Sequence, residues 1–148
     1  MESEATCVKT AASDLRENLL ALSGRSCGFE IRFTKGNGGI VIKTDATKCP
    51  SREESYRVTV GDDGVEIMGY DDLGTVYGIY AFATRCLGID PMYRFTEIFP
   101  LEREELWLSS QTVASSEKTA RFRGWFINDE DFLSGFAPSG AKRKITYN

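Results

Sequence analysis

The spacing of apolar residues predicts an amphipathic helix near the N-terminus. Three leucines follow the i, i+4, i+7 pattern of one helix face: Leu15, Leu19 and Leu22. Ser13 or Asp14 is a suitable N-cap for this helix, and Gly24 supplies its stop. We therefore expect a first helix that begins near Ser13 and ends at Gly24.

A second helix is predicted between Asp71 or Asp72, either of which can cap it, and Gly88. Its apolar face is expected to hold seven residues: Leu73, Val76, Tyr77, Tyr80, Ala83, Thr84 and Leu87. Gly74 and Gly78 lie one turn apart on this helix, which indicates a place where another backbone comes close.

Two hairpins are predicted between the helices. In the first, Phe29, Ile31 and Phe33 alternate with polar residues, and the apolar run 40–42 follows a glycine-rich turn. In the second, Tyr56, Val58 and Val60 precede the turn 61–64, and Val65 and Ile67 follow it. The order helix, two hairpins, helix predicts an α+β fold: a mainly antiparallel sheet of about four to six strands with two helices on one face, and a C-terminal tail.

The pattern changes after Pro100. Serine-rich stretches indicate a linker at 111–120, and an apolar run then follows: Phe122, Trp125, Phe126 and Ile127. The polar cluster 128–131 ends this run. We predict one α/β domain over 1–110, the linker 111–120 and a separate buried strand within 121–148.

Composition narrows the functions that this chain can have. The formal net charge is −4, which disfavours a nucleic acid partner. No histidine is present, so Ser-His-Asp triads, Cys-His dyads and HExxH zinc sites are excluded. The four cysteines never approach a C-x-x-C pattern, and we expect neither a metal nor a cofactor. The N-terminus lacks the features of a signal peptide and no stretch is long enough to span a bilayer, so we expect a cytoplasmic protein without a membrane partner, or a secreted or periplasmic one if a signal was removed.

The stretch from Tyr56 to Pro91 resembles the small α/β domain that precedes the barrel in glycoside hydrolase families 20, 67 and 115. Three segments carry the resemblance: Gly61-Asp62-Asp63-Gly64-Val65-Glu66-Ile67, then Gly69-Tyr70-Asp71-Asp72-Leu73-Gly74, then Tyr77-Gly78-Ile79-Tyr80 with Leu87-Gly88. The later run Phe122-Arg123-Gly124-Trp125-Phe126-Ile127-Asn128-Asp129-Glu130 is similar to the first strand of the following (β/α)8 barrel, closest to family 115.

This resemblance implies that Arg123, Asn128, Asp129 and Glu130 would line a sugar pocket in an intact parent, because barrel sites form where the strands end. Arg123 matches the arginine of the family 20 R-G-x-x-x-D pattern, but Asn128 stands at its aspartate position, which argues against a hexosaminidase. The same polar cluster also suits a helix cap or a turn. Hydrolysis needs two carboxyl groups facing each other across the bond, and fewer than thirty residues follow Arg121, so no catalytic residue is expected in this chain.

The sequence therefore predicts the non-catalytic N-terminal domain of a polysaccharide-degrading glycoside hydrolase, with the barrel as its partner. The implied activity is on a glucuronic-acid-bearing polysaccharide if the family 115 likeness holds. Two alternatives remain: a stand-alone carbohydrate-binding module using Trp107 or Tyr93, and a protein-interaction domain using the second helix. Without a barrel, we expect either disorder beyond about residue 115 or self-association through the segment 121–133.

Overall fold

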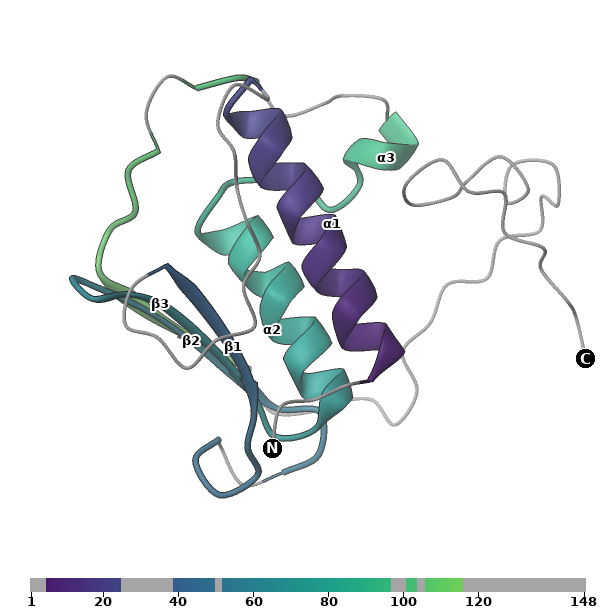
Figure 1. Ribbon diagram of the computed structural model, residues 1–148, viewed down its shortest axis with the longest axis vertical. Helices are drawn as coiled ribbons and strands as arrows, with labels where there is room; N and C mark the ends of the chain where they lie inside the picture. The colour runs from purple at the N-terminus through teal and green to yellow at the C-terminus, as the bar shows by residue number, and fades with distance from the viewer. Residues whose placement is uncertain (1–4, 25–38, 50–51, 97–100, 104–105, 116–148) are drawn as a thin grey trace, which may run out of the picture. The chain divides into compact units, whose positions relative to one another are not determined.

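A computed structural model describes residues 5–24, 39–49, 52–96, 101–103 and 106–115. They belong to one compact unit that extends to Ser115. Its elements in chain order are α1 (Thr6–Leu22), β1 (Ile40–Thr44), β2 (Tyr56–Gly61), β3 (Gly64–Gly69), α2 (Asp72–Arg85), the short α3 (Tyr93–Thr96) and β4 (Gln111–Ala114) (Figure 1). The predicted α+β class is confirmed.

The four described strands form one sheet in the order β1-β3-β2-β4. β2 pairs antiparallel with both β3 and β4, and β1 pairs parallel with β3. The sheet is therefore mainly antiparallel, as predicted. The parallel pair arises because β1 does not pair with the next strand in sequence but with β3, the second strand of the hairpin that follows.

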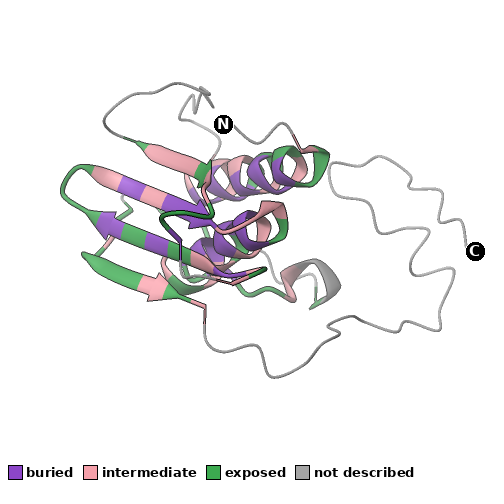
Figure 2. Cartoon of the chain, turned by 90° about the horizontal axis from the view of Figure 1, so that it is seen from below, coloured by how far each residue is buried: buried purple, intermediate pink, exposed green. Residues whose placement is uncertain are grey.

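Both long helices cover the same face of the sheet (Figures 1 and 2). α2 lies directly on the strands, and α1 packs beside it. The core between these layers is apolar, and its most deeply buried side chains include Val58, Ile67, Ile79, Phe82 and Leu87. Burial of this apolar surface, at about 25 cal/mol per Å², is the main force that holds the helices to the sheet.

The β2–β3 hairpin forms where the sequence predicts it. Gly61 pairs with Gly64, so Asp62 and Asp63 make the two-residue connection. Val58 and Val60 are buried against the helices while Arg57 and Thr59 are exposed, which is the alternation expected of a sheet covered on one face.

α1 begins seven residues before the predicted cap. Ala5 is the N-cap residue, and Ser13 and Asp14 lie within the helix. The apolar stripe continues upstream through Val8, Ala11 and Ala12, which are buried, so packing extends the helix past the capping residues that the sequence offers. Gly24 follows the helix with a positive φ of 65°, in line with the predicted stop.

The predicted cap of α2 is correct, and its predicted face is correct in part: Ala83 and Leu87 are buried and Val76 packs against the core. Leu73 is 48% and Tyr80 43% exposed, whereas Thr75, Ile79 and Phe82 are buried. The buried face is centred on the side that also holds Gly74 and Gly78, because the missing side chains let the helix approach the sheet and the loop before it. The close backbone approach predicted from these two glycines is confirmed at Gly74, where an added Cβ would collide with the Ser55 carbonyl oxygen.

The predicted linker is wrong at its start, and several other predictions concern residues that the structure does not describe. The linker was predicted to begin at residue 111, but Gln111–Ala114 form β4 and pair with β2. The prediction failed there because the strand is short and polar and its partner is distant in sequence. The first strand of the first predicted hairpin, the remaining linker residues 116–120 and the segment 121–148 lie outside the described residues.

Candidate functional site

The residues predicted to line a sugar pocket, Arg123, Asn128, Asp129 and Glu130, all lie outside the described residues. The same holds for the predicted self-association segment 121–133. In the described part of the chain, polar side chains gather at two other places: the junction before α2 and the outer face of the sheet.

Asp71 organises the junction before α2. Its Oδ1 accepts a hydrogen bond from the Gly74 N–H at 2.7 Å, which caps the helix, and its Oδ2 accepts from the Glu54 N–H at 3.0 Å. Glu54 has a φ of 61°, a left-handed conformation that is unfavourable for a residue with a side chain. The carboxylate therefore ties the loop before β2 to the start of α2, and it holds the Glu54 backbone in its unusual conformation.

Two threonine hydroxyls join α2 to the edge of the sheet. Thr75 is fully buried, and its hydroxyl donates to the Asp71 carbonyl at 2.9 Å. The Thr44 and Thr75 hydroxyl oxygens are 2.7 Å apart, so Thr44 donates to Thr75 when Thr75 donates to Asp71. A buried hydroxyl without a partner would be costly, and this chain of bonds satisfies both groups.

Cys49 and Ser55 complete the junction. The Cys49 sulfur lies 3.5 Å from the carbonyl oxygens of Ser55 and Met68, and the Ser55 hydroxyl donates to the Arg52 carbonyl at 2.6 Å. Burial raises the pKa of the Cys49 thiol, which disfavours the reactive thiolate. We therefore assign this cysteine a packing role.

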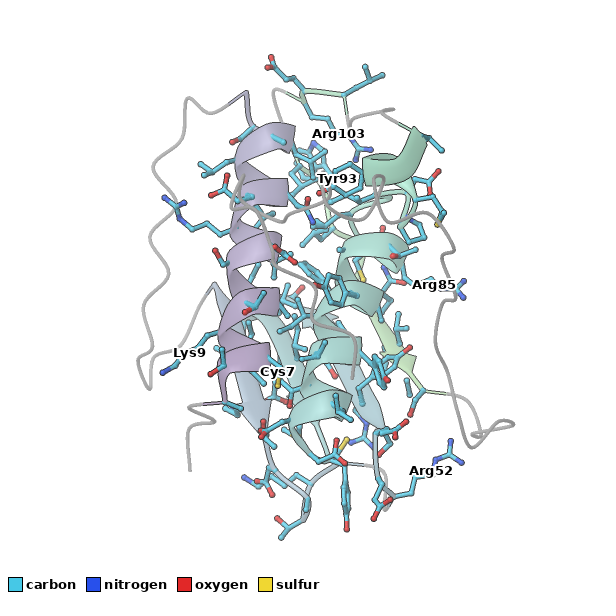
Figure 3. The ribbon with its side chains drawn as sticks, turned by 90° about the vertical axis from the view of Figure 1, so that its right-hand side faces the viewer. Cys7, Lys9, Arg52, Arg85, Tyr93 and Arg103 are labelled. Atoms are coloured by element: carbon cyan, nitrogen blue, oxygen red, sulfur yellow. The ribbon has the colours of Figure 1, made fainter. Side chains whose placement is uncertain are left out.

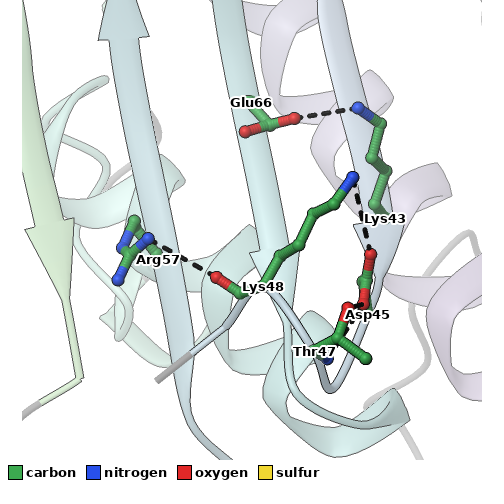
Figure 4. A network of polar contacts seen from close by, with 6 residues as sticks. All are labelled: Lys43, Asp45, Thr47, Lys48, Arg57 and Glu66. Atoms are coloured by element: carbon green, nitrogen blue, oxygen red, sulfur yellow. Dashed lines mark hydrogen bonds and ion pairs between the residues drawn. The ribbon is translucent and has the colours of Figure 1, made fainter. Parts of the chain in front are cut away.

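The outer face of the sheet carries charged and polar groups (Figure 4). Lys43 and Glu66 form an exposed ion pair at 2.8 Å between β1 and β3, and Arg57 donates to the Lys48 carbonyl at 3.5 Å. Asp45 accepts from both the hydroxyl and the N–H of Thr47, at 2.6 and 2.9 Å. These bonds lower the pKa of Asp45, the hydroxyl most strongly, so this carboxylate closes a turn and is not poised as a proton donor.

Three aromatic side chains, Tyr80, Tyr93 and Trp107, fall into two groups. The Tyr80 hydroxyl donates to Asp14 at 2.7 Å. The Tyr93 hydroxyl, on the residue labelled in Figure 3, donates to Asn18 at 2.8 Å, so both tyrosines link α1 to a neighbouring helix. Trp107 is 85% exposed, and the nearby Leu101 is 83% exposed. Of the two predicted sugar-stacking candidates, Trp107 offers an exposed ring, whereas Tyr93 packs against the core.

The buried polar side chains of the described residues make hydrogen bonds that stabilise the fold. Within that part of the chain, every buried side-chain nitrogen and oxygen has a hydrogen-bond partner. The same residues hold no group of three histidine, cysteine or acidic side chains arranged for a metal ion. None of the described helices is both long and apolar enough to cross a bilayer.

The sequence indicates Asp71 as a helix cap, but it does not indicate the bond between Asp71 and Glu54. That bond joins residues 17 positions apart, and no local pattern predicts it.

Comparison with known proteins places this fold among carbohydrate-active enzymes. No family model matches the chain, and no curated protein does. Among solved structures, BtGH115A, a family GH115 4-O-methyl-α-glucuronidase with specificity for decorated arabinogalactans, is similar with a TM-score of 0.62 and 26% identity. The match covers 77% of this chain and 16% of that enzyme.

A GH138 enzyme targeting pectin rhamnogalacturonan II is more distant, with a TM-score of 0.46 and 17% identity over 77% of this chain and 11% of that one. The chain thus spans 16% and 11% of the lengths of these two enzymes. Its described fold resembles one domain of a much longer glycoside hydrolase, which agrees with the resemblance found in the sequence.

Proposed function

We propose that this chain is the N-terminal accessory domain, similar to domain 2 of family 20, of a glycoside hydrolase that acts on polysaccharide, and that it supports the catalytic barrel that follows. The observation that carries this proposal is the likeness to BtGH115A over 77% of the chain. The order of the two sequence resemblances supports it, because the barrel-like run 122–130 follows the α/β domain in the sequence.

A non-catalytic role fits the chemistry of the described carboxylates. Hydrolysis of a glycoside uses two carboxyl groups on opposite sides of the scissile bond, about 5 to 9.5 Å apart. Asp71 caps α2, Asp45 closes a turn and Glu66 pairs with Lys43, so three of the described acids have structural partners. The catalytic pair would come from the barrel of the parent enzyme.

The substrate would carry a uronic acid. BtGH115A is a 4-O-methyl-α-glucuronidase with specificity for decorated arabinogalactans. A guanidinium group binds a sugar carboxylate with charge-assisted bonds, and Arg123 is the residue that the sequence offers for this contact in the intact parent. Asn128, Asp129 and Glu130 would contact the hydroxyls of the same sugar.

The first test is the coding sequence that follows codon 148. We expect several hundred further codons with alternating strand and helix patterns. The protein encoded by the whole frame should release glucuronic acid from arabinogalactan, and the 148-residue chain should release none. In the whole protein, Arg123→Ala should abolish release while the sheet variant Arg57→Ala retains it. A stop directly after codon 148 would remove the parent enzyme and with it this proposal.

A carbohydrate-binding role is the second candidate, and the exposure of Trp107 favours it. Aromatic rings stack on sugar faces, and a solvent-accessible indole is suited to that contact. Titration of the chain with arabinogalactan oligosaccharides would then show saturable binding that Trp107→Ala abolishes. Leu101→Ala is the matched control, because Leu101 is equally exposed but has no ring.

A further inference from the structure

The outer edge of β4 offers backbone groups for pairing with another strand. The Ser115 N–H donates to the Tyr56 carbonyl at 3.0 Å, which fixes the alternation of hydrogen bonds between β4 and β2. By that alternation, Gln111 and Val113 exchange backbone bonds with β2, whereas the N–H and C=O groups of Thr112 and Ala114 point to the opposite edge. β4 ends the sheet formed by the described strands, so no described strand pairs with that edge (Figure 2).

The sequence around β4 lacks two of the usual protections of a sheet edge, charge and proline. Natural edge strands are blunted by a short length, by lysine, by proline or by inward-pointing charge, and β4 has only the short length. The eleven residues 106–116 contain no charged residue and no proline, although 27% of the chain is charged. About three charged residues would be expected in a stretch of that length at this composition. The neutral stretch therefore leaves the β4 edge able to accept a strand.

We propose that β4 pairs antiparallel with β4 of a second copy of this chain, across a two-fold axis perpendicular to the sheet. Residues opposite each other in an antiparallel pair lie on the same face. Thr112 would therefore face the partner's Ala114 on the outer face, and Val113 would meet the partner's Val113 on the helix-covered face. This register uses all four edge-facing N–H groups, two from each copy, and it brings no like charges together.

Self-complementarity is the reason to assign a second copy as the occupant. A two-fold interface requires one patch that fits itself, and a neutral strand with apolar Val113 on its covered side meets that condition. The strand has only four residues, so the interface is smaller than that of a stable complex. We therefore expect weak association, with a dissociation constant on the order of 10⁻⁴ M. The proposal does not depend on the accessory-domain function.

Sedimentation equilibrium of the full 148-residue chain tests the proposal, from about 10 µM to 1 mM in 0.15 M salt, which screens the charge of −4. Ala114→Pro removes two of the four bonds and should weaken the dimer roughly tenfold or more, while the edge tolerates proline because this N–H faces away from β2. Thr112→Lys should weaken it as well. Thr59→Lys is the matched control: Thr59 is exposed on the same face, directly opposite Thr112, but not at the edge.

Hydrogen exchange of the unmodified chain adds a measurement that does not rely on a variant. The amides of Thr112 and Ala114 should become protected as concentration rises, and those of Gln111 and Val113 should change little. The proposal is overturned by a monomer at 1 mM, by equal effects of Thr59→Lys and Thr112→Lys, or by a dimer that survives Ala114→Pro. In the last case, loss of the dimer in Trp125→Lys would assign it to the segment 121–133.

Discussion

Replacement of Gly74 by alanine should destabilise the domain, against the normal effect of this substitution in a helix. In an isolated helix interior, alanine is favoured over glycine by about 1 kcal/mol. At this position a Cβ would collide with the Ser55 carbonyl oxygen. That carbonyl cannot retreat freely, because it accepts from the Tyr70 N–H at 2.9 Å and lies beside the Cys49 sulfur.

The expected cost follows from these contacts. Overpacking against a fixed neighbour costs about 1–3 kcal/mol or more, and loss of the Tyr70 bond adds about 1 kcal/mol. After subtraction of the gain in helix propensity, we expect a net loss of about 1–3 kcal/mol in the free energy of unfolding. For a domain near 100 residues, this lowers Tm by roughly 4–20 °C.

Thermal and urea unfolding followed by far-ultraviolet circular dichroism would measure the loss. Gly78→Ala should cost less stability than Gly74→Ala. Its Cβ would lie 3.0 Å from a methyl group of Ile67, and a side-chain methyl group can shift more easily than a backbone carbonyl. Gly61→Ala is the control, since its Cβ would meet nothing within 4 Å. A Gly74→Ala protein more stable than the wild type would refute the close approach of Ser55 to α2.

Three further predictions concern the core, the cysteines and acid stability. Phe82→Ala should cost about 3–5 kcal/mol in urea unfolding, because Phe82 is fully buried. Burial raises the pKa of the thiols of Cys49 and Cys86, whereas Cys7 is exposed, so mass spectrometry after brief alkylation at about pH 8 should find Cys7 modified before the other two. The pKa of Asp45 is lowered from 3.8 in the folded state, so its contribution is present above that pH and is lost as pH falls through the folded pKa. Unfolding titrations should therefore show a wild-type advantage over Asp45→Asn at about pH 6 that disappears in acid below 3.8.

Local patterns predicted the elements whose stabilising contacts are also local. The β2–β3 hairpin was predicted correctly because its turn residues, Gly61 to Gly64, lie between two alternating runs. The cap of α2 was predicted for the same reason, since Asp71 bonds to Gly74 three residues away. Where sequence neighbours make the contacts, propensity and pairing agree.

The errors arose where distant contacts decide the structure. β4 resembles a linker because Gln111–Ala114 is short and lies near serines, and only its pairing with β2 makes it a strand. The buried face of α2 was predicted only in part because hydrophobic spacing gives glycine no weight, although Gly74 and Gly78 mark the side that comes closest to its neighbours. The parallel pairing of β1 with β3 follows from the crossing of the chain, which periodicity does not encode.

A supporting domain and a binding domain would respond differently to the same variants. If the domain only supports a barrel, loss of the Gly74 contact lowers the folded fraction of the parent enzyme, so kcat per total protein falls with stability while KM stays constant. If Trp107 contacts the polysaccharide, Trp107→Ala raises KM and lowers Tm by less than Gly74→Ala does, because the indole is largely exposed. The two roles thus separate on stability and KM measured together, and the buried junction before α2 would contribute to the first role alone.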